Sequence, residues 1–142
     1  MNPLADLAGL RELSVQEAAD YVGGDARPKA ISQYGSLRDV QAITSKERGL
    51  QFVIQDGKVR LVYLGTAALP PVVSNESLTE AYGTGETLRS RQGRRAKLHV
   101  AADHGVAWSE QDGELGFVEL FAPTTFDRYR DEIYKEPPSF RQ

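Results

Sequence analysis

The amino-acid sequence predicts an α+β fold: two tandem units, each a helix followed by an antiparallel meander, that form one curved sheet with helices on one face. The main observation is an internal repeat, in which the segment GLQFVIQDGKVRLVYL (49–64) returns 56 positions later as GVAWSEQDGELGFVEL (105–120). Such self-similarity indicates a supersecondary unit that is built twice and packed against its copy. Two further observations are a helix signal before each copy and an average globular composition, with 40% hydrophobic and 26% charged residues.

The domain organisation follows from the chain length and from one proline pair. The chain of 142 residues has the length of a single domain, so we expect both units to share one fold. Pro70 and Pro71 end the first unit, because neither can donate a hydrogen bond to a β-ladder. The expected parts of the domain 1–142 are a first unit over 10–70, a second unit over 71–122 and a C-terminal tail over 123–142 that packs on the sheet.

A helix is expected at the start of each unit. Ser14 and Glu17 have the spacing of a capping box, and Gly23-Gly24 would stop a helix that runs to Val22. The other elements expected before the hairpins are a helix over 74–82, capped by Asn75 or Ser77, and short strands over 30–31, 40–44, 87–91 and 97–101.

The repeated segment itself predicts a β-hairpin with a two-residue type I′ turn at Asp56-Gly57, and an equivalent turn at Asp112-Gly113. Apolar residues on the two strands would then line one face of the first ladder. The expected cross-strand pairs are Ile54 with Val59, Phe52 with Leu61, and Leu50 with Tyr63.

The second copy differs from the first at positions on that apolar face. The replacements are Glu110 for Ile54, Glu119 for Tyr63, Trp108 for Phe52 and Phe117 for Leu61. Ionised carboxylates are costly to bury alone, so this face must be partly wet or each glutamate must meet a cation.

We therefore expect Trp108 and Phe117, rimmed by Glu110 and Glu119, to face a protein partner. Aromatic anchors with a polar rim are typical of interface hot spots. The alternative is that these side chains pack beneath the C-terminal tail, with the glutamates paired to Arg89 or Arg91. The full set of candidate partner-binding residues is Trp108, Phe117, Glu110, Glu119, Tyr63, Arg89 and Arg91.

Basic residues gather around Gly93, where the sequence predicts a hairpin. The cluster consists of Arg89, Arg91, Arg94, Arg95 and Lys97. Its charge suits contacts with phosphates or with an acidic protein surface. It lacks interleaved aromatic residues, however, and equally fits a solvated, salt-bridged edge strand.

The composition argues against several classes of function. The absence of cysteine excludes disulfides, thiolate metal sites and a cysteine nucleophile, and the net charge of −3 argues against a nucleic-acid-binding role. His99, His104 and Asp103 lack the spacing of a metal site, and Asp103 and His104 are adjacent in a predicted turn, so they do not make a triad with Ser109. We expect no metal, no cofactor, no catalysis, no membrane segment and a cytoplasmic location.

The order of elements in the second unit suggests a family. A helix ending at Tyr82-Gly83 precedes a hairpin, and Gly105-Val106-Ala107 leads to the Asp112-Gly113 turn and an apolar final strand. This outline, over Leu13 to Phe121, resembles the β-lactamase inhibitory proteins and the small outer-membrane assembly lipoproteins that share their half-unit. The resemblance implies a bacterial, non-catalytic protein with helices on one face of a curved sheet and a protein partner on the other. The chain departs from both groups, because it has neither the inhibitors' disulfides nor the lipoproteins' lipidated cysteine.

The sequence thus favours a protein-binding module, an inhibitor or immunity-type protein that occludes a toxin or an enzyme. Its charge distribution fits this role, because residues 71–142 carry twelve acids and nine bases whereas residues 1–70 carry eight of each. An acidic surface speeds association with a basic target.

Two alternatives come from other classes of function. One is a small-ligand-binding protein or an enzyme with a pocket between the units, where Tyr63, Trp108, Glu110 and His99 would converge. The other is a structural or assembly subunit that dimerises through an exposed strand edge.

Overall fold

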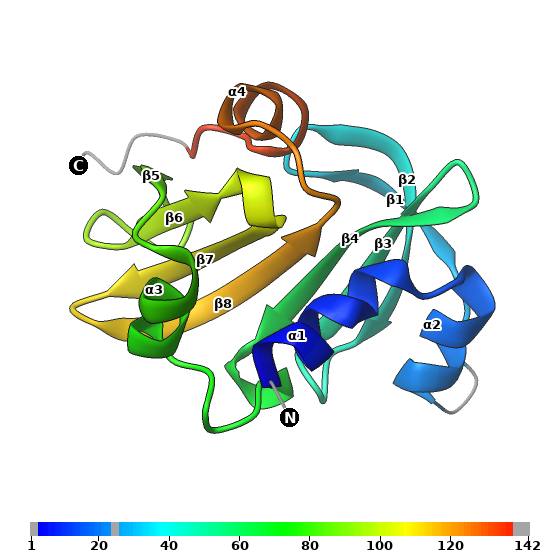
Figure 1. The fold of residues 1–142 in the computed structure, drawn as a ribbon. Coiled ribbons are helices and arrows are strands. Elements are labelled where there is room, and N and C mark those ends of the chain that lie inside the picture. The colour runs from blue at the N-terminus through cyan, green and yellow to red at the C-terminus, as the bar shows by residue number, and fades with distance from the viewer. Residues whose placement is uncertain (1–2, 24–25, 138–142) are drawn as a thin grey trace.

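The computed structural model describes residues 3–23 and 26–137, which form an α+β fold on one eight-stranded antiparallel sheet (Figure 1). The strands are β1 Lys29–Tyr34, β2 Leu37–Ser45, β3 Leu50–Gln55, β4 Lys58–Gly65, β5 Glu86–Arg89, β6 Lys97–Ala101, β7 Val106–Gln111 and β8 Glu114–Phe121. Their order across the sheet is β1-β2-β3-β4-β8-β7-β6-β5. Strands β1–β4 therefore form one meander and β5–β8 another, and the two meet where β4 pairs with β8.

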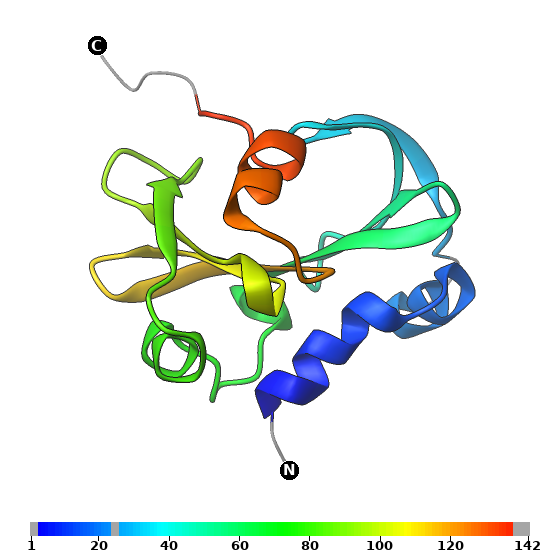
Figure 2. The ribbon, with the colours of Figure 1, turned by 45° about the horizontal axis from the view of Figure 1, so that its top comes forward.

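Helices lie on both faces of this sheet. The α-helices are α1 Pro3–Ala8, α2 Val15–Val22, α3 Asn75–Tyr82 and α4 Phe126–Arg128, and α4 continues as a π-helical turn over Tyr129–Ile133. Short 3-10 turns follow α1, β4 and β6, at Gly9–Glu12, Thr66–Ala68 and Ala102–His104. Figure 2 shows α1, α2 and α3 on one side of the sheet and α4 on the other, so the expectation that all helices share one face is not met by the C-terminal helical segment. None of the helices in the described ranges is long and apolar enough to cross a membrane.

The helix predicted at the start of each unit forms, as α2 and α3, but the capping residue predicted for α3 is wrong. Ser14 caps α2, since its hydroxyl accepts from the Glu17 amide while the Glu17 carboxylate accepts from the Ser14 amide. Helix α3 is capped by Ser74, one residue before the expected Asn75, and Ser77 supplies the reciprocal bond.

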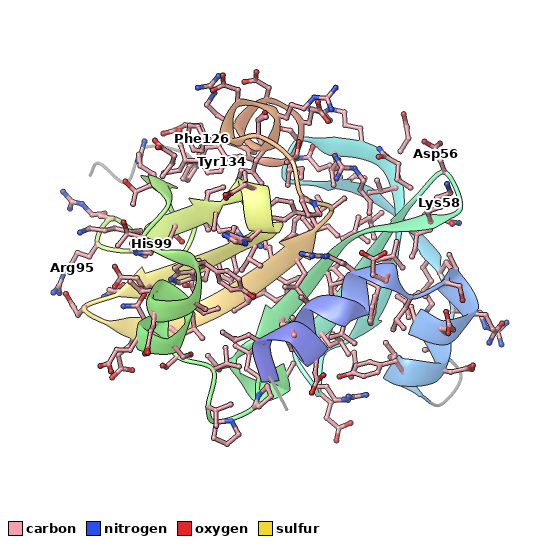
Figure 3. All side chains as sticks on the ribbon, in the orientation of Figure 1. Asp56, Lys58, Arg95, His99, Phe126 and Tyr134 are labelled. Atoms are coloured by element: carbon pink, nitrogen blue, oxygen red, sulfur yellow. The ribbon has the colours of Figure 1, made fainter. Side chains whose placement is uncertain are left out.

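A β-bulge changes the cross-strand pairs of the first hairpin. Figure 3 places Asp56 at the hairpin tip, where its φ of 53° fits the predicted turn, and Ile54 pairs with Val59 as expected. The register then shifts between Val53 and Ile54, because a bulge sets two residues of one strand against one of the other and moves the following residues to the opposite face. The other two predicted pairs are therefore wrong: Phe52 pairs with Val62, and Leu50 pairs with Leu64.

The second hairpin has the same bulge at the equivalent position, between Ser109 and Glu110. Its turn residue Asp112 also has a φ of 53°. The neighbouring strands keep the same relation, because His99 pairs with Trp108 just as Ile43 pairs with Phe52 fifty-six positions earlier. The backbone of β2–β4 is thus matched, pair for pair, in β6–β8.

Two apolar clusters fill the two faces of the sheet. The cluster between the sheet and α1–α3 includes Ile43, Phe52, Ile54, Leu78, Trp108 and Val118. The cluster between the sheet and the C-terminal helical segment includes Val53, Leu61, Phe117, Phe121, Tyr129 and Ile133. Each hairpin therefore contributes side chains to both clusters.

Candidate functional site

The structure separates the residues that the sequence placed on one surface. Because of the bulge, Trp108 lies on the face covered by α3, whereas Phe117 and Glu119 lie on the face covered by the C-terminal segment. The expectation that Trp108 and Phe117 share one exposed face is therefore wrong. Tyr63 also belongs with Phe117, so it does not converge with Trp108 in a common pocket.

Trp108 is a core residue of this chain. Its exposed fraction is 0%, and its indole Nε1 donates to Asn75 Oδ1 of α3 at 3.0 Å. The ring of His99 stacks on the indole with centroids 5.4 Å apart. The indole therefore packs beneath α3 and is closed off from solvent.

Glu110 is partnered on the same face. Its Oε1 lies 3.1 Å from His99 Nε2, and its Oε2 accepts from the Gly113 amide at 3.0 Å. The other ring nitrogen of His99 lies 3.1 Å from the Thr84 carbonyl oxygen. The hydrogen bond to His99, followed by the one from Gly113, lowers the pKa of Glu110. Glu110 and His99 form a structural pair.

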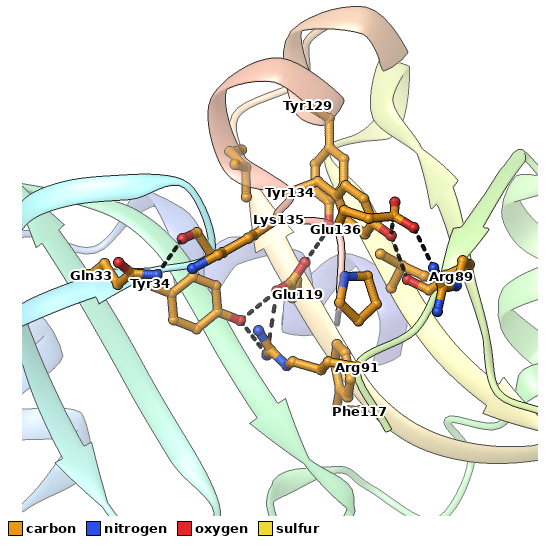
Figure 4. A pocket seen from close by; sticks show the side chains of 14 residues that line it. Gln33, Tyr34, Arg89, Arg91, Phe117, Glu119, Tyr129, Tyr134, Lys135 and Glu136 are labelled. Carbon is orange, nitrogen blue, oxygen red and sulfur yellow. Dashed lines mark hydrogen bonds and ion pairs between the residues drawn. The ribbon is translucent and has the colours of Figure 1, made fainter. Parts of the chain in front are cut away.

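The other face contains a pocket of about 260 Å³ between the first meander and the second (Figure 4). Gln33 and Tyr34 border it from the end of β1, Phe117 and Glu119 from β8, and the C-terminal segment closes it from above. In the described structure, side chains from both meanders and from the C-terminal segment meet here around the carboxylate of Glu119.

One wall of the pocket is held by the turn between β1 and β2. The Ser36 amide donates to the Ile133 carbonyl at 2.8 Å, and the Ser36 hydroxyl donates to the Tyr134 carbonyl at 2.6 Å. Gly35 has a φ of 55°, and a Cβ there would lie 2.1 Å from the Ile133 oxygen. Only glycine permits this approach, so the turn and the C-terminal segment are fixed against each other.

Glu119 forms the floor of the pocket. Its side chain is 4% exposed, and its Oε1 accepts from the Tyr129 hydroxyl at 2.5 Å while its Oε2 accepts from the Tyr34 hydroxyl. Burial, with the nearby Glu119 charge, raises the pKa of Tyr34 and of Tyr129 well above the ordinary value, so both hydroxyls remain donors. The carboxylate is thereby held in one orientation.

Arg91 sits over this floor in a box of aromatic rings. Its guanidinium carbon lies 5.0 Å from the ring centre of Tyr34, 5.5 Å from that of Tyr63 and 4.8 Å from that of Phe117. We call these three rings the aromatic box. Arg91 Nη2 donates to the Tyr34 hydroxyl at 2.9 Å and lies 3.7 Å from Glu119 Oε2. Burial alone would lower the pKa of Arg91, but Tyr34 and Glu119 outweigh it and raise the pKa.

Arg89, the remaining predicted residue, lies at the rim. Its guanidinium is 2.8 Å from Glu136 Oε1, and its carbonyl accepts from the Tyr134 hydroxyl at 2.7 Å. Burial, with the charge of Glu136, raises the pKa of Tyr134 to about 12. These contacts tie the strand β5 to the C-terminal segment.

The sequence reasoning missed the two tyrosines that orient Glu119. Tyr34 lies 85 positions from Glu119 and Tyr129 lies 10 positions from it. The sequence did contain one signal for these partners, because a carboxylate within an apolar strand needs hydrogen-bond or charge partners. That argument correctly anticipated Arg91 as one partner in the alternative interpretation.

The arrangement is suited to binding a cation through a carboxylate, two hydroxyl groups and three ring faces. In the described part of the chain no group of three or more histidine, aspartate or glutamate side chains is placed to hold a metal ion. No family model, curated protein or solved structure matches this chain.

Proposed function

We propose that the protein is a non-catalytic binding protein for a small ligand, and that the ligand occupies the pocket between the two meanders. The observation that carries this proposal is Glu119, a carboxylate that is 4% exposed at the floor of a pocket. Burying a charge costs free energy that a stabilising structural role alone seldom returns. A polar group placed at the base of a largely apolar pocket is the usual device for orienting a ligand.

The size of the pocket limits the ligand. Ligand pockets commonly measure about 300–1,000 Å³, and the volume of about 260 Å³ found here lies just below that range. The pocket therefore fits a small metabolite or the end of one side chain.

The arrangement of the strands supports a duplicated architecture, which we also propose. The pairings and the bulge of β2–β4 recur in β6–β8 at the offset of 56 residues. Where the meanders meet, Tyr63 pairs with Glu119, its own equivalent in the repeat. A pocket at this junction combines side chains from both copies, so each copy alone would lack half of the site.

A thermal-shift screen tests the proposed function. Wild-type protein and the variant Glu119→Gln are screened against a library of small metabolites, with Glu110→Gln as the matched control on the other face. A ligand that binds only the folded state raises the melting temperature, and we expect a hit that stabilises wild type and Glu110→Gln but not Glu119→Gln. Hits that stabilise all three proteins equally, or no hits, would count against the pocket.

The inhibitor or immunity-type role is a second proposal, favoured by the acidic excess in residues 71–142, the half that contributes Glu119. The resemblance to the β-lactamase inhibitory proteins belongs to this proposal. Of the large apolar side chains in the described residues, only Tyr21 and Val72 are exposed, at 40% and 58%. A protein partner would therefore be recognised through charged groups and the pocket.

A further inference from the structure

We propose that the pocket recognises a guanidinium group, and that Arg91 occupies it in the free protein as an internal substitute for the ligand. This inference rests on the proposed function and names the chemical class of the ligand. In the structure a guanidinium, that of Arg91, already sits in the aromatic box.

The surroundings of Arg91 match the chemistry of that group. A planar, weakly hydrated guanidinium stacks on ring faces better than an ammonium does, and the guanidinium carbon lies within 5.5 Å of all three ring centres. The Tyr34 hydroxyl accepts one of its N–H groups at 2.9 Å. A carboxylate completes the set below the rings.

Arg91 does not use that carboxylate fully. Its closest approach to Glu119 is 3.7 Å, beyond the 2.7–3.2 Å range of a hydrogen bond. Each oxygen of Glu119 accepts one tyrosine hydroxyl and retains capacity for a second donor. A guanidinium that enters from solvent at the correct angle can form the two parallel hydrogen bonds that Arg91 lacks.

The segment that carries Arg91 is fixed next to this residue by the buried Ser90, whose hydroxyl oxygen lies 2.6 Å from that of Ser109. It is the loop 90–96 between β5 and β6, whose three internal backbone hydrogen bonds measure 3.2–3.5 Å. The Arg91 side chain itself is 45% exposed. Withdrawal of the side chain towards solvent gives up the 2.9 Å hydrogen bond to Tyr34 and the three ring contacts, which an entering guanidinium can replace. The two tyrosine hydrogen bonds that hold Glu119 do not involve Arg91.

The test compares Arg91→Ala with Arg95→Ala, a control in the same loop whose guanidinium lies outside the pocket, 2.6 Å from Asp112. Calorimetric titrations use guanidinium chloride, L-arginine, a blocked Gly-Arg-Gly peptide and L-lysine, all at low millimolar concentration. We expect Arg91→Ala to bind at least one guanidinium probe about tenfold or more tighter than wild type and Arg95→Ala do. We expect the same variant to bind lysine about tenfold more weakly than it binds that guanidinium probe. Binding of free arginine alone identifies a metabolite, and binding of the peptide alone identifies an arginine side chain of a partner.

The proposal is overturned if Arg91→Ala shows no saturable binding of any guanidinium probe, or binds lysine equally well. If a different ligand from the screen still depends on Glu119, the proposed function stands and only the guanidinium assignment fails.

Should Arg91→Ala not fold, the side-chain Nε–H signal of Arg91 is followed by NMR in wild-type protein during titration with the same probes. Movement of that signal to its solvent-exposed position supports displacement, and an unchanged signal at saturation contradicts it.

Discussion

The two hairpins β3–β4 and β7–β8 have the same strand pairings and the same bulge, and differ in the side chains that they bury. The equivalent rows are Ile43, Phe52 and Ile54 in the first meander and His99, Trp108 and Glu110 in the second. The first row is wholly apolar, whereas the second contains a ring and a carboxylate that satisfy each other at 3.1 Å. Polar residues can therefore replace core aliphatic residues when they enter as a matched pair.

The opposite faces of the same hairpins make a sharper contrast. Tyr63 and Glu119 are equivalent residues and direct cross-strand partners. Glu119, however, takes its hydrogen bonds from Tyr34 and Tyr129, outside both hairpins. The second hairpin therefore carries a structural pair on one face and the floor of the candidate site on the other.

The largest expected effect is the loss of stability when the buried aromatic residue of either hairpin is replaced by alanine, and the loss should be similar in the two hairpins. Trp108 and Phe52 are both 0% exposed, so each substitution to alanine should lower the free energy of unfolding by about 3–5 kcal/mol. Chemical denaturation measures both variants, and Val72→Ala, at an exposed position, should change stability by less than about 0.5 kcal/mol. A Trp108→Ala variant as stable as Val72→Ala would contradict the core position of the indole.

The contrast also explains what the sequence could predict. Local signals identified both predicted helices, the cap at Ser14 and the turn at Asp56, because each depends on residues close together in the chain. The bulge could not be predicted from the sequence, because both hairpins contain it. Their lengths therefore match, and a comparison of the two copies shows no extra residue. That one extra residue per hairpin moved Tyr63, Phe117 and Glu119 to the other face. The tyrosine partners of Glu119 depend on contacts between separate elements, which periodicity does not report.

A double-mutant cycle tests whether His99 and Glu110 act as a pair. His99→Ile should cost about 3 kcal/mol, because it leaves a mostly buried carboxylate without its side-chain partner. The double variant His99→Ile, Glu110→Ile restores the residues of the first meander and should cost less than the sum of the single variants, with a coupling of about 0.5–3 kcal/mol. Additive losses would show that the two residues contribute independently.

Removing one hydroxyl from the floor of the site should have a moderate effect. Tyr34→Phe or Tyr129→Phe deprives one oxygen of Glu119 of its donor and should cost about 1–3 kcal/mol. The matched control is Tyr21→Phe, at a position that is 40% exposed. Equal stability of all three variants would mean that the hydroxyl groups do not hold the carboxylate.

The smallest expected effect is a pH dependence from Glu110. Because its pKa in the folded protein is lowered, chiefly by His99, this carboxylate stabilises the fold above its ordinary pKa near 4.5. The stabilisation is lost as the pH falls through the lower folded value. Unfolding measured from about pH 6 down to about pH 3 should therefore show a shallower loss of stability in Glu110→Gln than in wild type. Parallel curves of stability against pH would show that Glu110 does not contribute to the pH dependence.

The most direct test of the central claim uses NMR, because the two faces carry separate reporters. Trp108 is the only tryptophan of the chain, so its indole N–H gives one signal beneath α3. Titration with a ligand found in the screen should shift the signals of Tyr34, Tyr129 and Arg91 and leave the indole signal in place. A ligand that moves the indole signal and leaves those three unchanged would show that binding occurs on the other face.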